Sequence, residues 1–219
     1  MKKAILILSL ALISSYAISQ DQYPKGCYMS FEEIKVKTPS SNCYVKIKKR
    51  SDSDIAMSGG NDYKLISLNK TMKKKVLKKD IFAYSDGDSL FINCLPYLLQ
   101  IWYAKILSDG KYFVFIAGIP MDKTMQSPEM QTGMSFGAVG GAFAGASLAM
   151  QRYLYVLEKK TNQVKMIDFT LMKKILMEYP ELLEKFENEK RNQLMSTQVE
   201  YLKKVNELYN IKQMEINTN

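Results

Sequence analysis

Short apolar runs joined by turn residues recur through the middle of the chain, and this pattern constrains the fold more than any other feature. Asp86-Gly87 and Asp109-Gly110 each lie between two such runs. Asp-Gly in that position predicts a β-hairpin, because both residues of the favoured tight turn take positive φ. A third hairpin is predicted around residues 160–162. About seven or eight short strands at this spacing predict an antiparallel sheet or a small barrel-like domain.

Helices are predicted on both sides of this strand-rich region. Ser30 and Glu33 form a capping box, which is typical of a helix start. Thr170 is a candidate N-cap for a first C-terminal helix, and Pro180 is placed to begin a second one. The polar residues 187–193 predict that the C-terminal helix is exposed in its middle or broken there. The fold class is therefore α+β, with a C-terminal helical segment.

The N-terminus has the features of a cleavable secretory signal. Lys2 and Lys3 are cationic, residues 4–13 are an uncharged run too short to span a bilayer comfortably, and small residues precede a cut before Gln20. No lipobox cysteine follows the apolar run. We expect an exported protein, periplasmic or extracellular, that is not lipid-anchored. The chain then divides into a signal peptide, a β-rich domain and a C-terminal helical segment: residues 1–19, 20–169 and 170–219.

A Gly/Ala-rich apolar insertion, residues 130–151, interrupts the strand pattern and carries no charge. Its glycines recur every four residues at Gly133, Gly137, Gly141 and Gly145. On a helix they would share one face, which is the glycine-zipper pattern of helices that pack closely in membranes. Three interpretations stay open: a loop or helix packed on the protein's own sheet, an element for membrane-surface contact or self-association, and a glycine linker.

The chain is basic, with 31 Lys and Arg against 22 Asp and Glu. A basic exported protein is expected to meet lipid headgroups, polysaccharide or acidic proteins rather than nucleic acid. The densest run of lysines is a candidate contact for an anionic surface. It comprises Lys73, Lys74, Lys75, Lys78 and Lys79. The alternative is that this run is a solvated face of a short helical turn.

The absence of histidine from the sequence excludes Ser-His-Asp and Cys-His catalysis and His-based zinc sites. The spacing of Cys27, Cys43 and Cys94 matches no metal pattern. Cys43 and Cys94 are a candidate disulfide, and buried free thiols are the alternative. We therefore expect no catalytic residue, metal or cofactor. A second hypothesis is an exported hydrolase that uses carboxylates, which would need two facing carboxylates in a cleft.

Four motifs resemble those of a family of exported Bacteroidota proteins of unknown function. They are Tyr23-Pro24-Lys25-Gly26-Cys27-Tyr28-Met29-Ser30-Phe31-Glu32-Glu33, Ile81-Phe82-Ala83-Tyr84-Ser85-Asp86-Gly87, Asp109-Gly110-Lys111-Tyr112 and Tyr179-Pro180-Glu181-Leu182-Leu183. The resemblance implies an exported envelope protein and brings no known activity or catalytic residues. Our first hypothesis is a non-catalytic binding or assembly module, with a second copy of the chain or another envelope protein as candidate partner.

Overall fold

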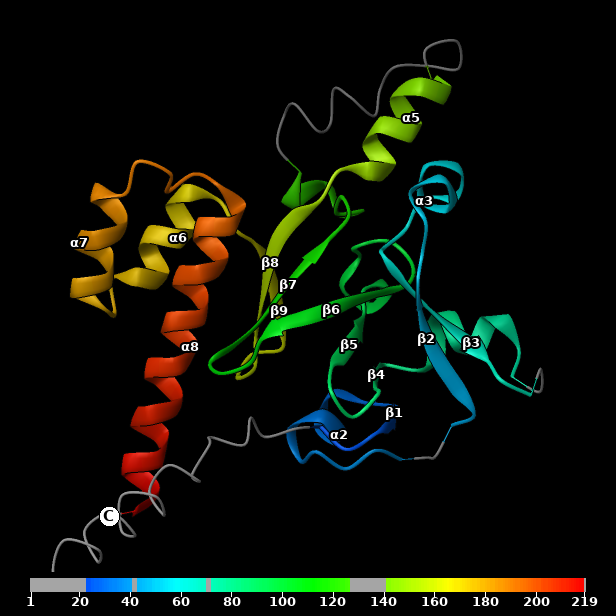
Figure 1. Cartoon of the computed structure of the whole chain (residues 1–219), viewed down its shortest axis with the longest axis horizontal. Coiled ribbons are helices and arrows are strands. Elements are labelled where there is room, and N and C mark those ends of the chain that lie inside the picture. Colours follow the sequence, from blue (N-terminus) through cyan, green and yellow to red (C-terminus); the bar gives the residue numbers. More distant parts are fainter. Residues whose placement is uncertain (1–22, 41–42, 70–71, 127–140, 219) are drawn as a thin grey trace, which may run out of the picture.

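The computed structural model describes residues 23–40, 43–69, 72–126 and 141–218. In these residues nine strands form one open antiparallel sheet, flanked by helices (Figure 1). The predicted α+β class is confirmed, and the sheet is open rather than closed into a barrel. The strands are β1 (Gly26–Tyr28), β2 (Val45–Lys49), β3 (Tyr63–Ser67), β4 (Ala83–Ser85), β5 (Leu90–Asn93), β6 (Tyr103–Ser108), β7 (Tyr112–Ala117), β8 (Tyr153–Glu158) and β9 (Gln163–Met166).

The strand order is β1-β4-β5-β6-β7-β8-β9, and β2 and β3 lie off this path as a two-stranded ribbon. The ribbon pairs with the rest of the sheet at one point, where Tyr63 of β3 lies opposite Tyr103 of β6. The ribbon is seen on the right of Figure 1. Its position therefore depends on side-chain packing and on covalent or polar ties more than on backbone pairing.

All three predicted hairpins form, but the two Asp-Gly turns differ from the expected geometry. Of the Asp-Gly residues, only Gly87 has positive φ, at 102°. In the turn between β4 and β5, the Asp86 carboxylate accepts hydrogen bonds from the backbone N–H groups of Asp88 and Ser89 at 3.1 and 2.8 Å. The Asp86 side chain therefore stabilises a different turn from the expected one, in which two residues would have positive φ.

The three helices that capping residues predicted all form, one of them with a shifted cap, and the helix at residues 52–58 was not predicted. The helices are α2 (Phe31–Lys35), α3 (Asp52–Ser58), α5 (Gly141–Met150), α6 (Phe169–Leu176), α7 (Pro180–Asn188) and α8 (Met195–Thr218), with short turns η1 (Val76–Asp80), η2 (Leu95–Tyr97) and η3 (Lys123–Met125). Ser30 caps α2 as predicted. Asp168, rather than Thr170, caps α6, because its carboxylate accepts the backbone N–H of Leu171 at 2.7 Å. The C-terminal helical region is broken at residues 189–194, between α7 and α8, so the predicted break near residues 187–193 forms.

Strands β7 and β8 are buried on both faces. Val114 and Val156 point toward α6, α7 and α8, which lie together on one side of the sheet (left in Figure 1). Phe115 and Tyr155 point the other way and stack with ring centroids 5.7 Å apart. The C-terminal helices therefore share a hydrophobic core with β7 and β8.

The Gly/Ala-rich insertion lies partly outside the described residues. Gly133 and Gly137 fall outside them, whereas Gly141 and Gly145 belong to α5. Among the helices that the structure describes, none is long and apolar enough to cross a bilayer. The glycine-zipper interpretation of residues 130–151 stays a prediction, as does the signal peptide at residues 1–19, which also lies outside the described part of the chain.

Candidate functional site

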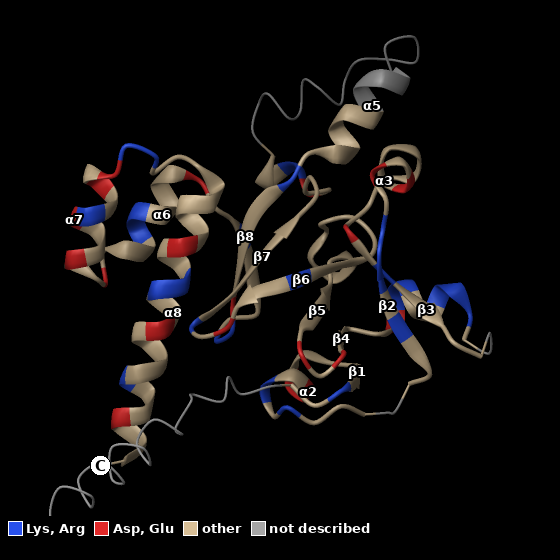
Figure 2. Ribbon diagram, viewed as in Figure 1, with Lys and Arg blue, Asp and Glu red and all other residues tan. Residues whose placement is uncertain are grey.

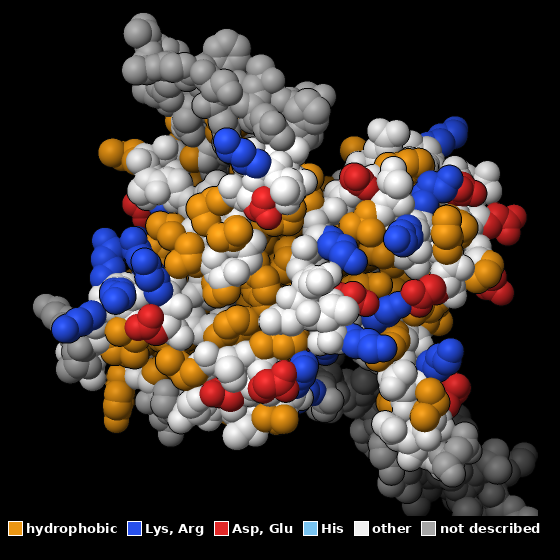
Figure 3. Space-filling model, turned by 180° about the vertical axis from the view of Figure 1, so that it is seen from behind, with side chains coloured by type: hydrophobic (Ala, Val, Ile, Leu, Met, Phe, Trp, Pro, Cys, Tyr) orange, Lys and Arg blue, Asp and Glu red, His pale blue; other side chains and the backbone are white. Residues whose placement is uncertain are grey.

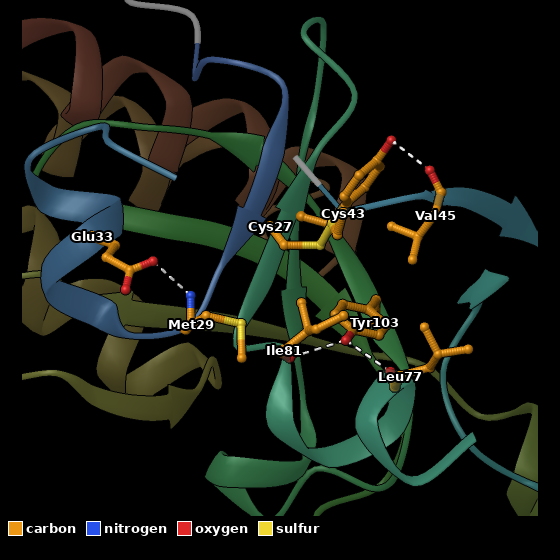
Figure 4. Close-up of a disulfide and its surroundings, with 9 residues drawn as sticks. Cys27, Met29, Glu33, Cys43, Val45, Leu77, Ile81 and Tyr103 are labelled. Carbon is orange, nitrogen blue, oxygen red and sulfur yellow. Dashed lines mark hydrogen bonds between the residues drawn. A yellow bond between two sulfur atoms is a disulfide. The ribbon is translucent and has the colours of Figure 1, made fainter. Parts of the chain in front are cut away.

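A disulfide joins β1 to the start of the β2–β3 ribbon. It links Cys27 to Cys43, with the two Cα atoms 5.8 Å apart (Figure 4). The predicted pairing of Cys43 with Cys94 is wrong, because Cys94 is buried in the core on the opposite face of the sheet. Burial raises the pKa of the Cys94 thiol, so this cysteine stays protonated and unreactive. Sequence spacing carried no signal for the correct pair.

Two tyrosine hydroxyls tie the ribbon and η1 to the main sheet. The Tyr103 hydroxyl of β6 lies 2.9 and 3.0 Å from the carbonyl oxygens of Leu77 and Ile81, which share its single proton, and this contact holds η1 near both of its ends (Figure 4). Tyr84 of β4 donates to the carbonyl of Val45 at 3.4 Å. Together with the disulfide, these contacts hold the ribbon and η1 against the sheet.

Lysines of β2, β3 and the η1 region form a surface that we call the basic face. It comprises Lys46, Lys48, Lys49, Lys64, Lys73, Lys74, Lys75, Lys78 and Lys79. The lysines of β2, β3 and η1 lie at the same end of the molecule (right in Figure 2), and Figure 3 shows basic side chains gathered at that end from behind. The structure thus brings the predicted cluster of residues 73–79 together with lysines of β2 and β3 that sequence reasoning had not included.

The charge of the basic face is largely uncompensated. Among the salt bridges between described residues, only one involves this face, with Lys64 Nζ 3.1 Å from an Asp54 carboxylate oxygen. Burial lowers the pKa of Lys78, and the neighbouring charges of Lys74, Arg50 and Lys79 lower it further. The cationic side chains around Lys78 are therefore close enough to repel one another.

Comparison with known proteins places the chain in a family. Residues 26–209 match the family of unknown function DUF6563. The chain belongs to the DUF6563 family. No curated protein and no solved structure matches it. The family is one of unknown function, as the resemblance implied, and the matched region includes the disulfide and the whole basic face.

A buried arginine in this DUF6563 chain holds the other end of the ribbon. Arg50 is 4% exposed, and its guanidinium donates to the carbonyls of Asp54, Gly59 and Asn61 at 2.9, 2.7 and 2.9 Å and to the Ser58 hydroxyl at 2.7 Å. Sequence reasoning missed this role, because Arg50 follows a run of lysines that reads as solvated surface. These four hydrogen bonds join the end of β2 to α3 and to the loop that follows it, so Arg50 positions the ribbon.

Asn61 continues the same junction to the segments that precede β6 and follow β7. Its buried amide donates to the carbonyls of Leu99 and Ile101 at 2.9 and 3.1 Å and accepts the backbone N–H of Gly118 at 2.7 Å. Asp62 beside it forms a salt bridge of 2.7 Å with Arg152, which precedes β8. The ribbon is thereby anchored at both ends: by the disulfide at one and by this polar junction at the other.

In the part of the chain that the structure describes, no buried carboxylate is available to act as a general acid or base. The buried polar side chains of the described residues are Arg50, Asn61, Ser85, Asn93, Gln198 and Asn206, which include no carboxylate. Hydrogen bonding to Lys64 lowers the pKa of Asp54, whereas a general acid requires a raised one. The described part of the chain also contains no cluster of His, Cys, Asp and Glu side chains suited to a metal ion.

One cavity, of about 200 Å³, has two glutamates in its lining and lies between β8, β9 and α6. Both glutamates already have partners. Glu178 accepts from Lys111 Nζ at 2.6 Å, and Glu158 accepts from the Thr161 hydroxyl at 2.9 Å. These contacts hold the two carboxylates as structural groups, so no feature of the cavity favours the hydrolase hypothesis.

Proposed function

We propose that this DUF6563 chain is an exported cell-envelope protein that acts by binding or assembly and not by catalysis. Its contact with the envelope is the basic face, and the component that it binds is anionic. The observation that carries this proposal is the gathering of largely uncompensated lysines on a ribbon and a turn that are anchored at both ends. Because these elements are held in place, little ordering is needed when the lysines meet a partner.

Export is supported by two independent features of the chain. Disulfides persist in oxidising compartments outside the cytosol, and the structure contains the Cys27–Cys43 disulfide. The N-terminal residues 1–19 have the charge, length and small-residue pattern of a cleavable signal. Nucleic acid is a poorer partner for such a protein than an anionic lipid, a polysaccharide or an acidic envelope protein.

Cell fractionation tests this proposal directly. In the test variant, the five lysines of the η1 region are changed to glutamine: Lys73, Lys74, Lys75, Lys78 and Lys79. The matched control loses the same charge from exposed lysines of the C-terminal region: Lys185, Lys190, Lys203, Lys204 and Lys212. We expect the test variant to move from the envelope fraction to the soluble exported fraction, while the control stays with the envelope.

The same preparation tests export, because N-terminal sequencing of the recovered protein should begin at or near Gln20. Equal envelope retention of the two lysine variants would contradict the role of the basic face. Recovery of the unprocessed chain from the cytosol would contradict export.

A further inference from the structure

The β2–β3 ribbon has an inner and an outer face, because side chains alternate along each strand. Val45 points inward and is 3% exposed, so Lys46, the next residue, points outward. The strand register places Ile66 opposite Lys46, and Lys64 opposite Lys48. The outer face of the ribbon therefore combines three lysines with an aliphatic side chain.

Two large apolar side chains stand exposed at the end of the ribbon that the disulfide anchors. Tyr44 is 68% exposed and Leu68 is 57% exposed. The backbone N–H of Leu68 donates to the carbonyl of Tyr44 at 2.8 Å, so the two residues are neighbours across the ribbon. Cys43, which precedes Tyr44, is bonded to Cys27 of β1, and this bond holds the exposed pair in place.

This combination of side chains matches the chemistry of a phospholipid surface. Tyrosine favours the headgroup level of a bilayer, and an aliphatic side chain beside it gains free energy by leaving water. Lysine stems lie along such apolar surface while their ammonium groups reach the phosphates. A purely polysaccharide ligand would leave Leu68 and Ile66 without a suitable partner, because neither side chain can donate or accept a hydrogen bond.

We propose that the outer face of the β2–β3 ribbon docks on an anionic phospholipid bilayer. Tyr44 and Leu68 enter the headgroup region, and Lys46 and Lys48 contact lipid phosphates, with the lysines of η1 adding longer-range attraction. This inference rests on the proposed function and narrows the anionic component from any envelope polymer to lipid. It requires no membrane-spanning segment.

Vesicle cosedimentation of the exported chain tests the inference. The vesicles contain phosphatidylglycerol with phosphatidylcholine, and pure phosphatidylcholine vesicles are the reference. Changing Tyr44 and Leu68 to serine should weaken partition to the anionic vesicles about tenfold, since two apolar side chains lose their burial. The matched control changes Leu208 and Ile211 to serine; these residues of α8 are 43% and 49% exposed, and their loss should change nothing.

A fluorescence measurement gives the same test without removing apolar surface. The chain has one tryptophan, Trp102, which is 7% exposed, so Tyr44→Trp adds a reporter at the proposed contact. We expect its emission to shift to shorter wavelength with phosphatidylglycerol vesicles and to stay unchanged with phosphatidylcholine vesicles.

Lys46→Gln and Lys48→Gln should each weaken partition to the anionic vesicles by about fivefold, the effect of one basic residue near an anionic surface.

The possible outcomes separate this inference from the proposed function. If the chain binds dextran sulfate but not anionic vesicles, the lipid inference is overturned and the proposed function stands. If vesicle binding depends on the lysines but not on Tyr44 and Leu68, the docking geometry is overturned. If the chain binds neither probe and the η1 lysine variant behaves like the wild type in cells, both proposals fail.

Discussion

Asn206 couples the C-terminal helix to the sheet through a side chain that takes the place of a neighbouring strand. Its amide oxygen accepts the backbone N–H of Tyr112 at 3.0 Å, and its amide nitrogen donates to the Tyr112 carbonyl at 2.8 Å. Gly110 makes this approach possible, because a Cβ atom at that position would lie 2.5 Å from Cβ of Asn206. The glycine of the second Asp-Gly turn is thus required for space and not for positive φ.

Replacement of Asn206 by alanine should destabilise the protein by about 1–3 kcal/mol, because a buried backbone N–H and a buried carbonyl lose their partners. Chemical unfolding followed by circular dichroism measures the change. The control is Asn210→Ala one turn later, where the exposed amide donates to the carbonyl of Asp109 at 3.1 Å and its loss should cost little. Equal effects of the two substitutions would contradict the role given to Asn206.

Local sequence signals predicted the structural role of a residue only where its hydrogen-bond partner lies a few positions away in the chain. Ser30 caps α2 because its hydroxyl accepts the N–H of Glu33, three residues on. Arg50 and Asn61, in contrast, act on groups brought near by the packing of the ribbon, and nothing in their immediate sequence distinguishes them from surface residues.

The ribbon of β2 and β3 is the element on which the proposed function depends. The three hairpins could be predicted because their turns join strands that are adjacent in the chain. The ribbon's place beside β6 could not, because a single residue pair, Tyr63 with Tyr103, joins it to the sheet. The predicted pairing of Cys43 with Cys94 is wrong for a related reason. Both cysteines lie in strand-like runs of the sequence, but Cys94 faces the opposite side of the sheet.

Changing Cys27 and Cys43 to serine should lower the free energy of unfolding by about 3 kcal/mol, the value expected for a closed loop of this length. Reduction of the wild-type disulfide should lower it by a similar amount. Alkylation of the oxidised, unfolded protein followed by peptide mass spectrometry checks the pairing, since Cys94 should be the cysteine that is modified. Three reactive thiols under these conditions would contradict the disulfide.

At the scale of the whole molecule, the two ends differ in charge and in packing. The C-terminal helices α6, α7 and α8 pack on β7 and β8, whereas the ribbon and η1 carry the basic face at the opposite end (Figure 2). Composition predicted the net positive charge of the chain but not its distribution, because lysines of β2 and of η1 are far apart in the sequence. The fold brings them to one end.

Amine labelling in the intact envelope tests the central claim most directly. Purified protein and protein in its native envelope are treated with the same lysine-reactive reagent, and the labelled sites are quantified by mass spectrometry. We predict that Lys46, Lys48 and Lys73–Lys79 are protected in the envelope, while Lys203 and Lys212 of α8 react as they do in the purified protein. Equal reactivity of the basic face in both samples, or protection confined to α8, would contradict the account.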